Sequence, residues 1–416
     1  MVVVGTGAAG LMAGIHAARR LPGGGRVVGL DGARRIGMKI LVAGGGRCNV
    51  THHAVRPEDY AGSSRPAIRK VLGRFSVERT IEFFAELGVE LKREPTGKLF
   101  PVTNRAKTVL EALLGAWDDA GADLRFPRRI ENIEPLDGGF RVRGERTDLF
   151  AGRVILATGG KALPKSGSDG AGYELARSLG HTITNALHPA LVPLLLEERS
   201  ELRGISGIAT EARLEIRDGR GKPIASYTAP ILCTHFGVSG PVVLDASRHL
   251  LAARHAGDTE ACAVVDWLPN RDRAGFEREL LGSKGAQTIA GLLRGVLPER
   301  MVATLAGIAG LAPTDRARGL SREQRGRLLT TIFEQRLGVV GDRGYAHAEA
   351  TAGGVPLSEV RLDSMESRIR PGLHLVGEIL DVDGRVGGFN FQWAWASGHV
   401  AGVAASKTVD AESPKA

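Results

Sequence analysis

The first residues of the chain alternate between strand-like and helical patterns. Three valines at positions 2–4 form a short apolar run, an alanine-rich stretch to about residue 20 has helical spacing, and a second apolar run covers 26–30. Glycines fill the turn between the first run and the helical stretch. A strand, a glycine turn, a helix and a second strand in this order predict a βαβ unit at the start of an α/β domain.

The patterns that follow extend this domain. Helical spacing covers 76–87 and 105–120, alternating strands lie near 129–133 and 139–143, and an apolar strand covers 154–157. These elements predict an α/β domain that carries a small β meander.

The last part of the chain returns to the same type of pattern. Residues 373–376 read as an apolar strand, and helical spacing runs from about 391 to 404. A final strand and helix of this kind complete a domain that began at the N-terminus. We therefore predict that residues 1–190 and 350–416 form one Rossmann-type domain, with an insertion between them.

The inserted segment shows two kinds of residue pattern, one strand-like and one helical. Short strand-like runs at 212–216 and 224–227 are separated by turns without helices, so 191–270 and 339–349 are predicted to form a mainly-β, barrel-like cap. Helical spacing predicts a small helical subdomain over 271–338. A chain of 416 residues is long enough for several domains. The predicted fold class is α/β, with a Rossmann-type domain, an inserted β cap and a helical subdomain.

The glycine turn at the N-terminus has the spacing of a dinucleotide-binding motif. Gly5 would make the tight turn, Gly7 would let the backbone approach a pyrophosphate, and Gly10 would let the helix pack closely on the strand. Asp31 ends the next strand 21 residues after Gly10, where a carboxylate binds ribose hydroxyls. This pair predicts an adenine dinucleotide and disfavours a 2′-phosphorylated nucleotide in the same half-site.

A second glycine cluster spans 44–46 and is followed by Arg47, Cys48 and Asn49. Consecutive glycines let backbone amides converge on an anion, and Arg47 and Lys39 add positive charge for phosphates or for a reduced flavin. A flexible loop is the alternative interpretation.

Cysteine spacing limits what Cys48 can do. The three cysteines are separated by 185 and 29 residues, which excludes a CxxC pair and gives no metal-ligand spacing. We expect Cys48 to pack beside a flavin without forming a disulfide. The neighbouring Arg47 could instead lower the thiol pKa and favour a thiolate.

Two further segments could complete a flavin site. Thr158, Gly159 and Gly160 follow the strand at 154–157, and acidic and glycine residues lie between 377 and 390, before the last helix. Acidic side chains there can bind ribityl hydroxyls, and glycine amides with the helix dipole can stabilise a reduced isoalloxazine ring. Segments from both ends and the middle of the chain would thus contact one FAD, held without a covalent bond. The predicted cofactor-binding residues are Gly5, Thr6, Gly7, Ala8, Ala9, Gly10, Asp31, Lys39, Gly45, Gly46, Arg47, Cys48, Asn49, Ile130, Thr158, Gly159, Gly160, Gly377, Glu378, Asp381, Gly387, Gly388, Phe389 and Asn390.

Charge and composition narrow the partners. The formal charge is +9, but arginines are scattered and aromatic residues make up only 5%, which argues against a base-stacking nucleic-acid surface. No basic leader or cleavage site precedes the first strand, and no apolar run approaches a membrane span. We expect a cytoplasmic protein that is not anchored to a membrane and acts on a small molecule.

Several segments resemble one family of bacterial flavoproteins. They include GMKILVAGGGRCNVTH (37–52), ATGGKALPKSGSDGAGYELARSLGH (157–181), THFGVSGPVVLDASR (234–248) and MESRIRPGLHLVGEILDVDGRVGGFNFQWAWASG (365–398). On these residues the chain is identified as similar to the HI0933-like or BaiN-like NAD(P)/FAD-dependent oxidoreductases. The resemblance implies an FAD-binding Rossmann domain, a β-barrel-like insertion and a helical subdomain, with the flavin facing the domain interface. Fumarate-reductase-type flavoproteins are more distantly similar.

Two positions depart from the family pattern. Met1 stands at the start of the first strand, where relatives carry a few extra residues, and Asp31 replaces a commoner Glu, which shortens the reach to the ribose. One branch of the family has been linked to reduction of unsaturated steroid intermediates, but the resemblance does not define a substrate for this chain.

The sequence therefore favours an FAD-dependent oxidoreductase. NADH or NADPH would reduce the flavin, which would reduce a small unsaturated or carbonyl substrate bound between the FAD domain and the cap. No second GxGxxG follows a strand, so nicotinamide would bind transiently, and an oxygen-using oxidase stays open. A flavin-dependent RNA-modifying enzyme and a redox sensor are the alternatives. The candidate catalytic residues are Arg47 and His235, although His235 could instead be hydrogen-bonded inside the cap.

Overall fold

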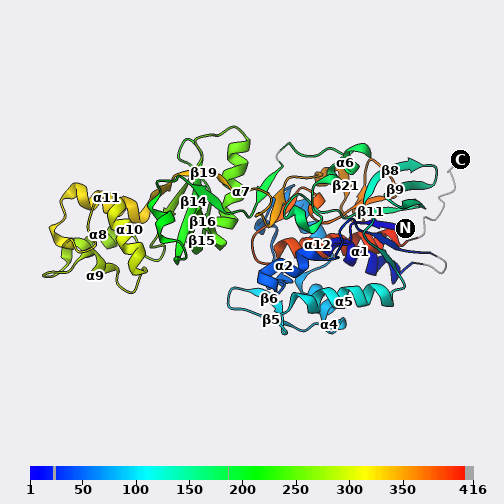
Figure 1. Ribbon diagram of the computed structural model, residues 1–416, viewed down its shortest axis with the longest axis horizontal. Helices are drawn as coiled ribbons and strands as arrows, with labels where there is room; N and C mark the ends of the chain where they lie inside the picture. Colours follow the sequence, from blue (N-terminus) through cyan, green and yellow to red (C-terminus); the bar gives the residue numbers. More distant parts are fainter. Residues whose placement is uncertain (22–24, 186, 408–416) are drawn as a thin grey trace. The chain divides into compact units, whose positions relative to one another are not determined.

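The computed structural model describes residues 1–21, 25–185 and 187–407. Contacts divide the chain into two compact units, drawn with their elements labelled in Figure 1. Unit 1 comprises Met1–Leu187 with Ala350–Ala416, and unit 2 comprises His188–Glu349. Our finer division into an FAD domain, a β cap and a helical subdomain stays a prediction.

Unit 1 is built on a seven-stranded sheet in the order β21-β22-β23-β11-β1-β2-β7. The five strands from β23 to β7 run parallel, and β22 and β21 are antiparallel additions. The central strands are buried on both faces, which explains why they read as unbroken apolar runs. The strands are β1 (Val2–Val4), β2 (Val28–Leu30), β7 (Asp123–Arg125), β11 (Val154–Leu156), β21 (Val360–Arg361), β22 (Glu366–Ser367) and β23 (Leu373–Leu375).

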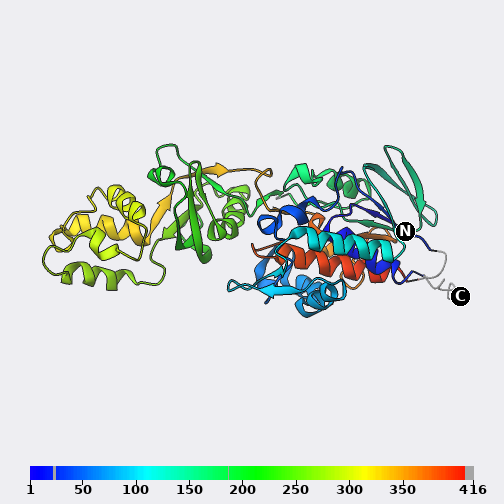
Figure 2. The ribbon, with the colours of Figure 1, turned by 60° about the horizontal axis from the view of Figure 1, so that its bottom comes forward.

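Helices α1 (Ala8–Ala18), α5 (Ala106–Asp119) and α12 (Phe389–Ala405) cover this sheet, and α5 and α12 both contact α1 (Figure 2). The contact of α12 with α1 is unusually close because two glycines of α12 face the backbone of α1. A Cβ added at Gly398 would lie 2.5 Å from the carbonyl oxygen of Ala9, and one at Gly402 would lie 2.3 Å from that of Ala13. No larger side chain fits at either position.

Smaller elements complete unit 1. The predicted meander is present and has a third strand that the sequence did not indicate, and a short helix occupies the start of the predicted glycine loop. The elements are β8 (Ile130–Leu136), β9 (Gly139–Gly144), β10 (Thr147–Ala151), β3 (Thr51–His52), β4 (Tyr60–Gly62), β5 (Leu91–Arg93), β6 (Lys98–Pro101), β20 (Ala350–Ala352), β24 (Val382–Gly384), α2 (Met38–Gly46), α3 (Arg65–Leu72), α4 (Val77–Glu86) and α6 (Ala171–Ser178).

Unit 2 contains a second seven-stranded sheet, in the order β18-β17-β14-β15-β16-β13-β19, with antiparallel pairing throughout. The predicted runs at 212–216 and 224–227 lie in β14 and β15. The strands are β12 (His188–Ala190), which lies outside this sheet, β13 (Leu194–Leu196), β14 (Ala209–Arg217), β15 (Pro223–Thr234), β16 (Gly237–Ser239), β17 (Cys262–Asp266), β18 (Gln335–Leu337) and β19 (Val339–Asp342).

The helices of unit 2 share one apolar core with its sheet. Leu292, Leu305 and Leu328 belong to the same buried cluster as Val265 and Trp267. Helix α7 packs on β14 and β15, in a segment that we expected to be mainly β. The helices are α7 (Pro241–His255), α8 (Arg273–Gly282), α9 (Ile289–Leu293), α10 (Glu299–Ile308) and α11 (Arg322–Phe333). Within the described residues, no helix of either unit is long and apolar enough to cross a membrane.

Two histidines lie where α1 meets α12, His16 buried and His399 partly buried. The rings of His16 and His399 lie 4.4 Å apart beside Phe75 and Phe83. Burial and the neighbouring cations lower the pKa of His16 to about 2 and that of His399 to about 4. Both are therefore neutral in the folded protein near neutral pH.

These histidines predict that the protein loses stability in mild acid. A histidine whose pKa is lowered on folding contributes full stability above its unfolded pKa of about 6.5, and less as the pH falls toward the folded pKa. Between about pH 7.5 and about pH 5, His16→Met should lose roughly 2 kcal/mol less free energy of unfolding than the wild type. Urea unfolding at both pH values measures this. Exposed His347, changed to Gln, is the control, and equal losses in wild type and His16→Met would contradict the assignment.

Candidate functional site

The N-terminal glycine turn has the geometry that its spacing predicts. Gly5 has a φ of 88°, and a Cβ there would lie 2.5 Å from the carbonyl oxygen of Ala157. A Cβ at Gly10 would lie 1.9 Å from the carbonyl oxygen of Gly5. A Cβ at Gly7, which begins α1, would meet no atom within 4 Å. Gly5 and Gly10 are thus needed for packing, whereas Gly7 keeps an open space in front of a helix N-terminus.

Asp31 holds this turn against the end of β2. Its Oδ2 accepts hydrogen bonds from the Thr6 amide at 2.7 Å and the Thr6 hydroxyl at 3.0 Å, and its Oδ1 accepts one from the Ala33 amide at 2.8 Å. A carboxylate has about four acceptor positions, so one remains for a ligand hydroxyl. Asp31 is therefore a structural residue of the turn as well as a candidate ribose ligand.

Ile130 lies close to Asp31 in the fold, although 99 residues separate them in the sequence. The Arg128 amide donates to the Asp31 carbonyl oxygen at 2.6 Å, which brings the start of β8 beside the loop that follows β2. Ile130 is the first residue of β8 and is buried. Its predicted role as a cofactor-binding residue is compatible with this placement near Asp31 and stays a prediction.

The second glycine cluster ends α2 with three consecutive left-handed residues. Gly44, Gly45 and Gly46 have φ values of 57°, 67° and 84°, and all three are exposed. The amides of Arg47 and Cys48 both donate to the Ala43 carbonyl oxygen, so they cap the helix instead of pointing at an anion. Only the glycine amides are left for the anion-binding role that the sequence suggested.

The two cations predicted for the site each have a carboxylate partner. Lys39 Nζ lies 2.7 Å from an oxygen of Glu378, and Arg47 lies 2.6 Å from an oxygen of Glu94. The guanidinium of Arg47 also stacks over Phe100 at 4.0 Å from the ring centre. Much of the positive charge that the sequence assigned to this region is therefore balanced within the protein.

Cys48 is fully buried, and burial raises the pKa of its thiol to about 12. Arg47 does not offset this effect, because its guanidinium contacts Glu94. A neutral, packed thiol agrees with the expected packing role and not with a thiolate. All three cysteines are free.

Two buried polar atoms at predicted site residues have no hydrogen-bond partner among the described residues. They are Oδ1 of Asn49 and Oγ1 of Thr158. Buried polar atoms are nearly always hydrogen-bonded in native proteins, so unpaired atoms of this kind call for an explanation. A bound cofactor that reorders these loops would supply one.

The middle and C-terminal glycines pack directly on the N-terminal turn and its neighbours. A Cβ at Gly160 would lie 2.5 Å from Oγ1 of Thr351, and one at Gly377 would lie 2.8 Å from the Cβ of Ala9. A Cβ at Gly388 would lie 2.6 Å from the backbone carbon of Thr51. Within unit 1 the structure thus brings the segment after β11 and Gly377 to the N-terminal turn, and the loop at 387–388 to β3.

Some predicted residues have structural partners of their own. Asn390 bonds to both the amide and the carbonyl of Gly384, which closes the turn before α12, and Phe389 is buried. Near them lie two residues that the sequence analysis did not single out. A Cβ at Gly387 would lie 3.6 Å from Cε of Lys98 and 3.8 Å from Cδ2 of His52. His52 ends the GMKILVAGGGRCNVTH segment, but only the folded chain brings Lys98 to it.

The surroundings of Asp381 disfavour the charged form of its carboxyl group. Burial, and after it the nearby Asp383, raises the pKa of the Asp381 carboxyl to about 6, although Ser63 donates a hydrogen bond to it at 3.3 Å. The folded protein therefore carries a carboxylate there at neutral pH at some expense to its stability. Such a group is a good candidate for binding hydroxyl groups of a ligand.

His235 lies in unit 2, at the exposed turn between β15 and β16. Its ring contacts Phe236 edge-on at 5.1 Å, and its carbonyl oxygen accepts a hydrogen bond from Arg203. The ring is therefore accessible to solvent and is not hydrogen-bonded inside the cap. Its proposed role as an acid stays a prediction.

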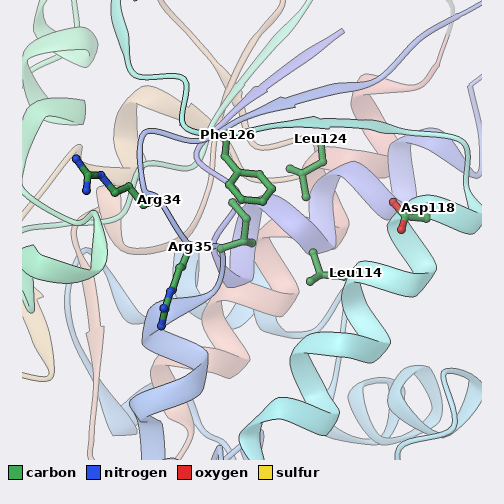
Figure 3. Close-up of a pocket in the computed structure, with 7 residues that line it drawn as sticks. Arg34, Arg35, Leu114, Asp118, Leu124 and Phe126 are labelled. Carbon is green, nitrogen blue, oxygen red and sulfur yellow. The ribbon is translucent and has the colours of Figure 1, made fainter.

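A hollow of about 460 Å³ lies on unit 1 beside the loop that follows Asp31 (Figure 3). Apolar side chains form its floor, and the two arginines point away from them in the view. None of the glycine segments contributes to it. Its lining residues are Arg34, Arg35, Ile36, Leu114, Asp118, Leu124 and Phe126.

The fold and the glycine-lined site define a Rossmann-type flavoprotein of the oxidoreductase class. The chain belongs to the HI0933-like protein Rossmann domain family, whose model matches residues 1–404. The fold resembles the quinol fumarate reductase subunit FrdA of E. coli, with a TM-score of 0.51 and 17% identity over 97% of this chain and 69% of the other. It also resembles 3-ketosteroid delta1-dehydrogenase of Sterolibacterium denitrificans, with a TM-score of 0.51 and 12% identity over 98% and 99%.

Curated relatives match over nearly their whole length. A 3-dehydro-bile acid delta(4,6)-reductase of Clostridium scindens is 36% identical over 97% of this chain and 98% of its own. A ribosomal RNA dihydrouridine synthase of Escherichia coli is 29% identical over 95% of each chain. That of Haemophilus influenzae is also 29% identical, over 98% of each chain. The predicted class of FAD-dependent oxidoreductase is therefore confirmed.

Substitutions of Gly10 and Gly7 should have different effects, one on stability and the other on FAD binding. Gly10→Ala should lower the stability of the protein without cofactor, because its Cβ would overlap the Gly5 carbonyl oxygen. Gly7→Ala should leave that stability within about 1 kcal/mol but weaken FAD binding at least tenfold, because the methyl group enters the open space. Thermal unfolding and FAD titration measure the two effects. Unchanged FAD affinity in Gly7→Ala would place the pyrophosphate elsewhere.

We predict that the Asp381 carboxylate lowers the stability of the cofactor-free protein but strengthens FAD binding. A carboxyl whose pKa is raised by folding destabilises the folded state increasingly as the pH rises above its unfolded pKa, and fully once the pH exceeds the folded pKa. Asp381→Asn should therefore stabilise the cofactor-free protein by about 1 kcal/mol near pH 8, after allowance for solvent screening, and by less near pH 5. The same variant should bind FAD more weakly. A destabilised Asp381→Asn at both pH values would refute this account.

Proposed function

We propose that the protein is an FAD-dependent reductase that hydrogenates a carbon–carbon double bond conjugated to a carbonyl group. The observation that carries the proposal is the convergence of glycine segments from both ends and the middle of the chain on the N-terminus of α1, with open space in front of Gly7. The pyrophosphate would bind to the amides there, the ribose to Asp31, and the ribityl chain to Asp381 and Glu378. These assignments follow the predicted cofactor-binding residues.

The relatives support this substrate class. The name of the Clostridium scindens relative describes reduction of double bonds in a 3-dehydro-bile acid, and the other two names describe conversion of uridine to dihydrouridine. In each case two hydrogen atoms are added across a carbon–carbon double bond. FAD, when bound, would supply the hydride for the carbon remote from the carbonyl, and a group of the protein or solvent would supply a proton to the carbon next to the carbonyl. His235 stays our candidate for the acid that delivers this proton.

NADH or NADPH is the proposed electron donor. One dinucleotide half-site is accounted for by FAD, and the sequence has no second GxGxxG after a strand, so the nicotinamide nucleotide would bind only for the duration of hydride transfer. NAD(P)H and a proton together supply the two hydrogen atoms that the double bond gains. An oxygen-using oxidase would instead transfer electrons from its substrate to oxygen.

A nucleic-acid substrate is the second candidate, and one feature of the chain favours it. Residues 271–338 contain 12 Lys and Arg but 7 Asp and Glu, which is five of the nine excess positive charges of the protein. Several of these cations are exposed and have no ion pair among the described residues, including Arg278, Lys284, Arg316 and Arg318. The positive charge is therefore concentrated more in residues 271–338 than the scattered arginines of the whole chain suggest.

One experiment tests both candidates. The purified protein should be yellow, release intact FAD on heating, and show rapid anaerobic bleaching with NADH or NADPH in stopped flow. The reduced protein is then mixed with a conjugated enone steroid, a small conjugated enone, and a uridine-rich ribosomal RNA fragment. Reoxidation by either enone at a rate well above that without acceptor supports the first candidate. Reoxidation by the RNA fragment alone favours the second, and release of FMN or absence of flavin excludes both.

The outcome with oxygen completes the test. If the flavin is not reduced by either nicotinamide nucleotide but is reduced by a saturated ketone and reoxidised by oxygen, the protein works as an oxidase and the proposed direction is wrong. The Gly7→Ala variant is the matched control, because it should fold but bind FAD more weakly, so its flavin content should be lower at the same FAD concentration.

A further inference from the structure

A small antiparallel sheet of strands β3, β6 and β5 lies next to the proposed flavin site. His52 of β3 pairs directly with Lys98 of β6, so their side chains share one face of this sheet. Phe100, two residues beyond Lys98, lies on the same face. Leu99 and its partner Arg93 of β5 lie on the opposite face.

Two of the predicted glycine segments meet this face: the cluster at 44–46, expected to bind phosphates or a reduced flavin, and the loop before α12, expected to contact the isoalloxazine ring. A Cβ at Gly44 would lie 2.8 Å from Phe100, and one at Gly387 would lie 3.6 Å from Lys98 Cε and 3.8 Å from His52 Cδ2. Segments more than 340 residues apart in the sequence thus approach the same patch of side chains. The ammonium of Lys98 lies one bond beyond the atom that approaches Gly387.

His52 is fixed in this patch. Its ring stacks on Phe389 at 4.9 Å between centres, and its Nε2 lies 3.1 Å from the carbonyl oxygen of Thr96. A ring held on two sides limits the space that is open to the neighbouring lysine stem.

Lys98 differs from Lys39 and Arg47 in having no counter-charge among the described residues. Lys39 is paired with Glu378, and Arg47 is paired with Glu94. Among the described residues, the ammonium of Lys98 makes no ion pair or hydrogen bond, although the residue is only half exposed. A fully solvated surface lysine would need no partner, but a half-buried one next to a ligand loop is placed to receive negative charge from the ligand.

We infer that Lys98 would lie beside a bound flavin and would stabilise the negative charge that the ring carries after two-electron reduction. The inference rests on the proposed function, since it requires FAD in this site. Hydride transfer to the ring adds two electrons and one proton, so the product is an anion unless a second proton follows. An unpaired ammonium next to the anionic ring would favour the reduced form of the flavin and so raise its reduction potential.

The test compares reduction potentials of the FAD-loaded protein. Lys98→Met should lower the potential of bound FAD by about 30 mV or more, which corresponds to at least tenfold in the two-electron equilibrium. Lys98→Arg should stay close to the wild type because it retains the charge. Arg93→Met is the matched control, since it removes an unpaired cation from the opposite face of the same sheet and should leave the potential unchanged.

A second measurement uses the wild type and so does not depend on the variant folding. In a pH titration of the absorbance of the reduced protein, the flavin should stay anionic to a lower pH than free reduced FAD does. An unchanged potential in Lys98→Met, or a reduced wild-type flavin that titrates like free FAD, would overturn the inference and leave the proposed function intact. A wild-type protein that binds no FAD would instead refute the proposed function, and this inference with it.

Discussion

The structure depends on how closely the backbone of α1 approaches its neighbours. Gly10 lets the helix begin directly beneath the Gly5 carbonyl, and Gly398 and Gly402 of α12 contact the carbonyls of Ala9 and Ala13. Each contact would be abolished by a single added methyl group. Helix α12 follows the loop that contains Gly387 and Gly388. The packing of α12 on α1 therefore also sets the distance between this C-terminal loop and the N-terminal turn.

The sequence predicted well those elements whose burial is uniform. Strands such as Val154–Leu156 are covered on both faces, so their apolar runs were unambiguous, and the N-terminal motif combined a strand, a glycine turn and a helix in a fixed order. It predicted less well where local and tertiary preferences disagree. Helix α2 was missed because three of its nine residues are glycines, and α7 was missed within a segment whose neighbours are strands.

The side-chain roles at the site were harder to predict than the backbone. The sequence showed Lys39 and Arg47 as free cations because their partners, Glu378 and Glu94, are 339 and 47 residues away. Charge balance is a property of three-dimensional neighbours, so no local pattern could have shown that both cations are paired. The same reason hid Lys98, which has no motif of its own and becomes notable only when β6 pairs with β3.

These ion pairs change the roles that we expected for the charged residues of the site. Paired cations hold loops in place, since Lys39 ties α2 to the C-terminal segment and Arg47 ties the glycine loop to the turn after β5. Their charges are largely compensated before any ligand binds, so they contribute little additional potential to it. An uncompensated charge exerts a larger effect on a nearby anion at the same distance. With Cys48 neutral and Arg47 paired, our proposal leaves the electrostatic influence on a reduced ring to Lys98 and the backbone amides.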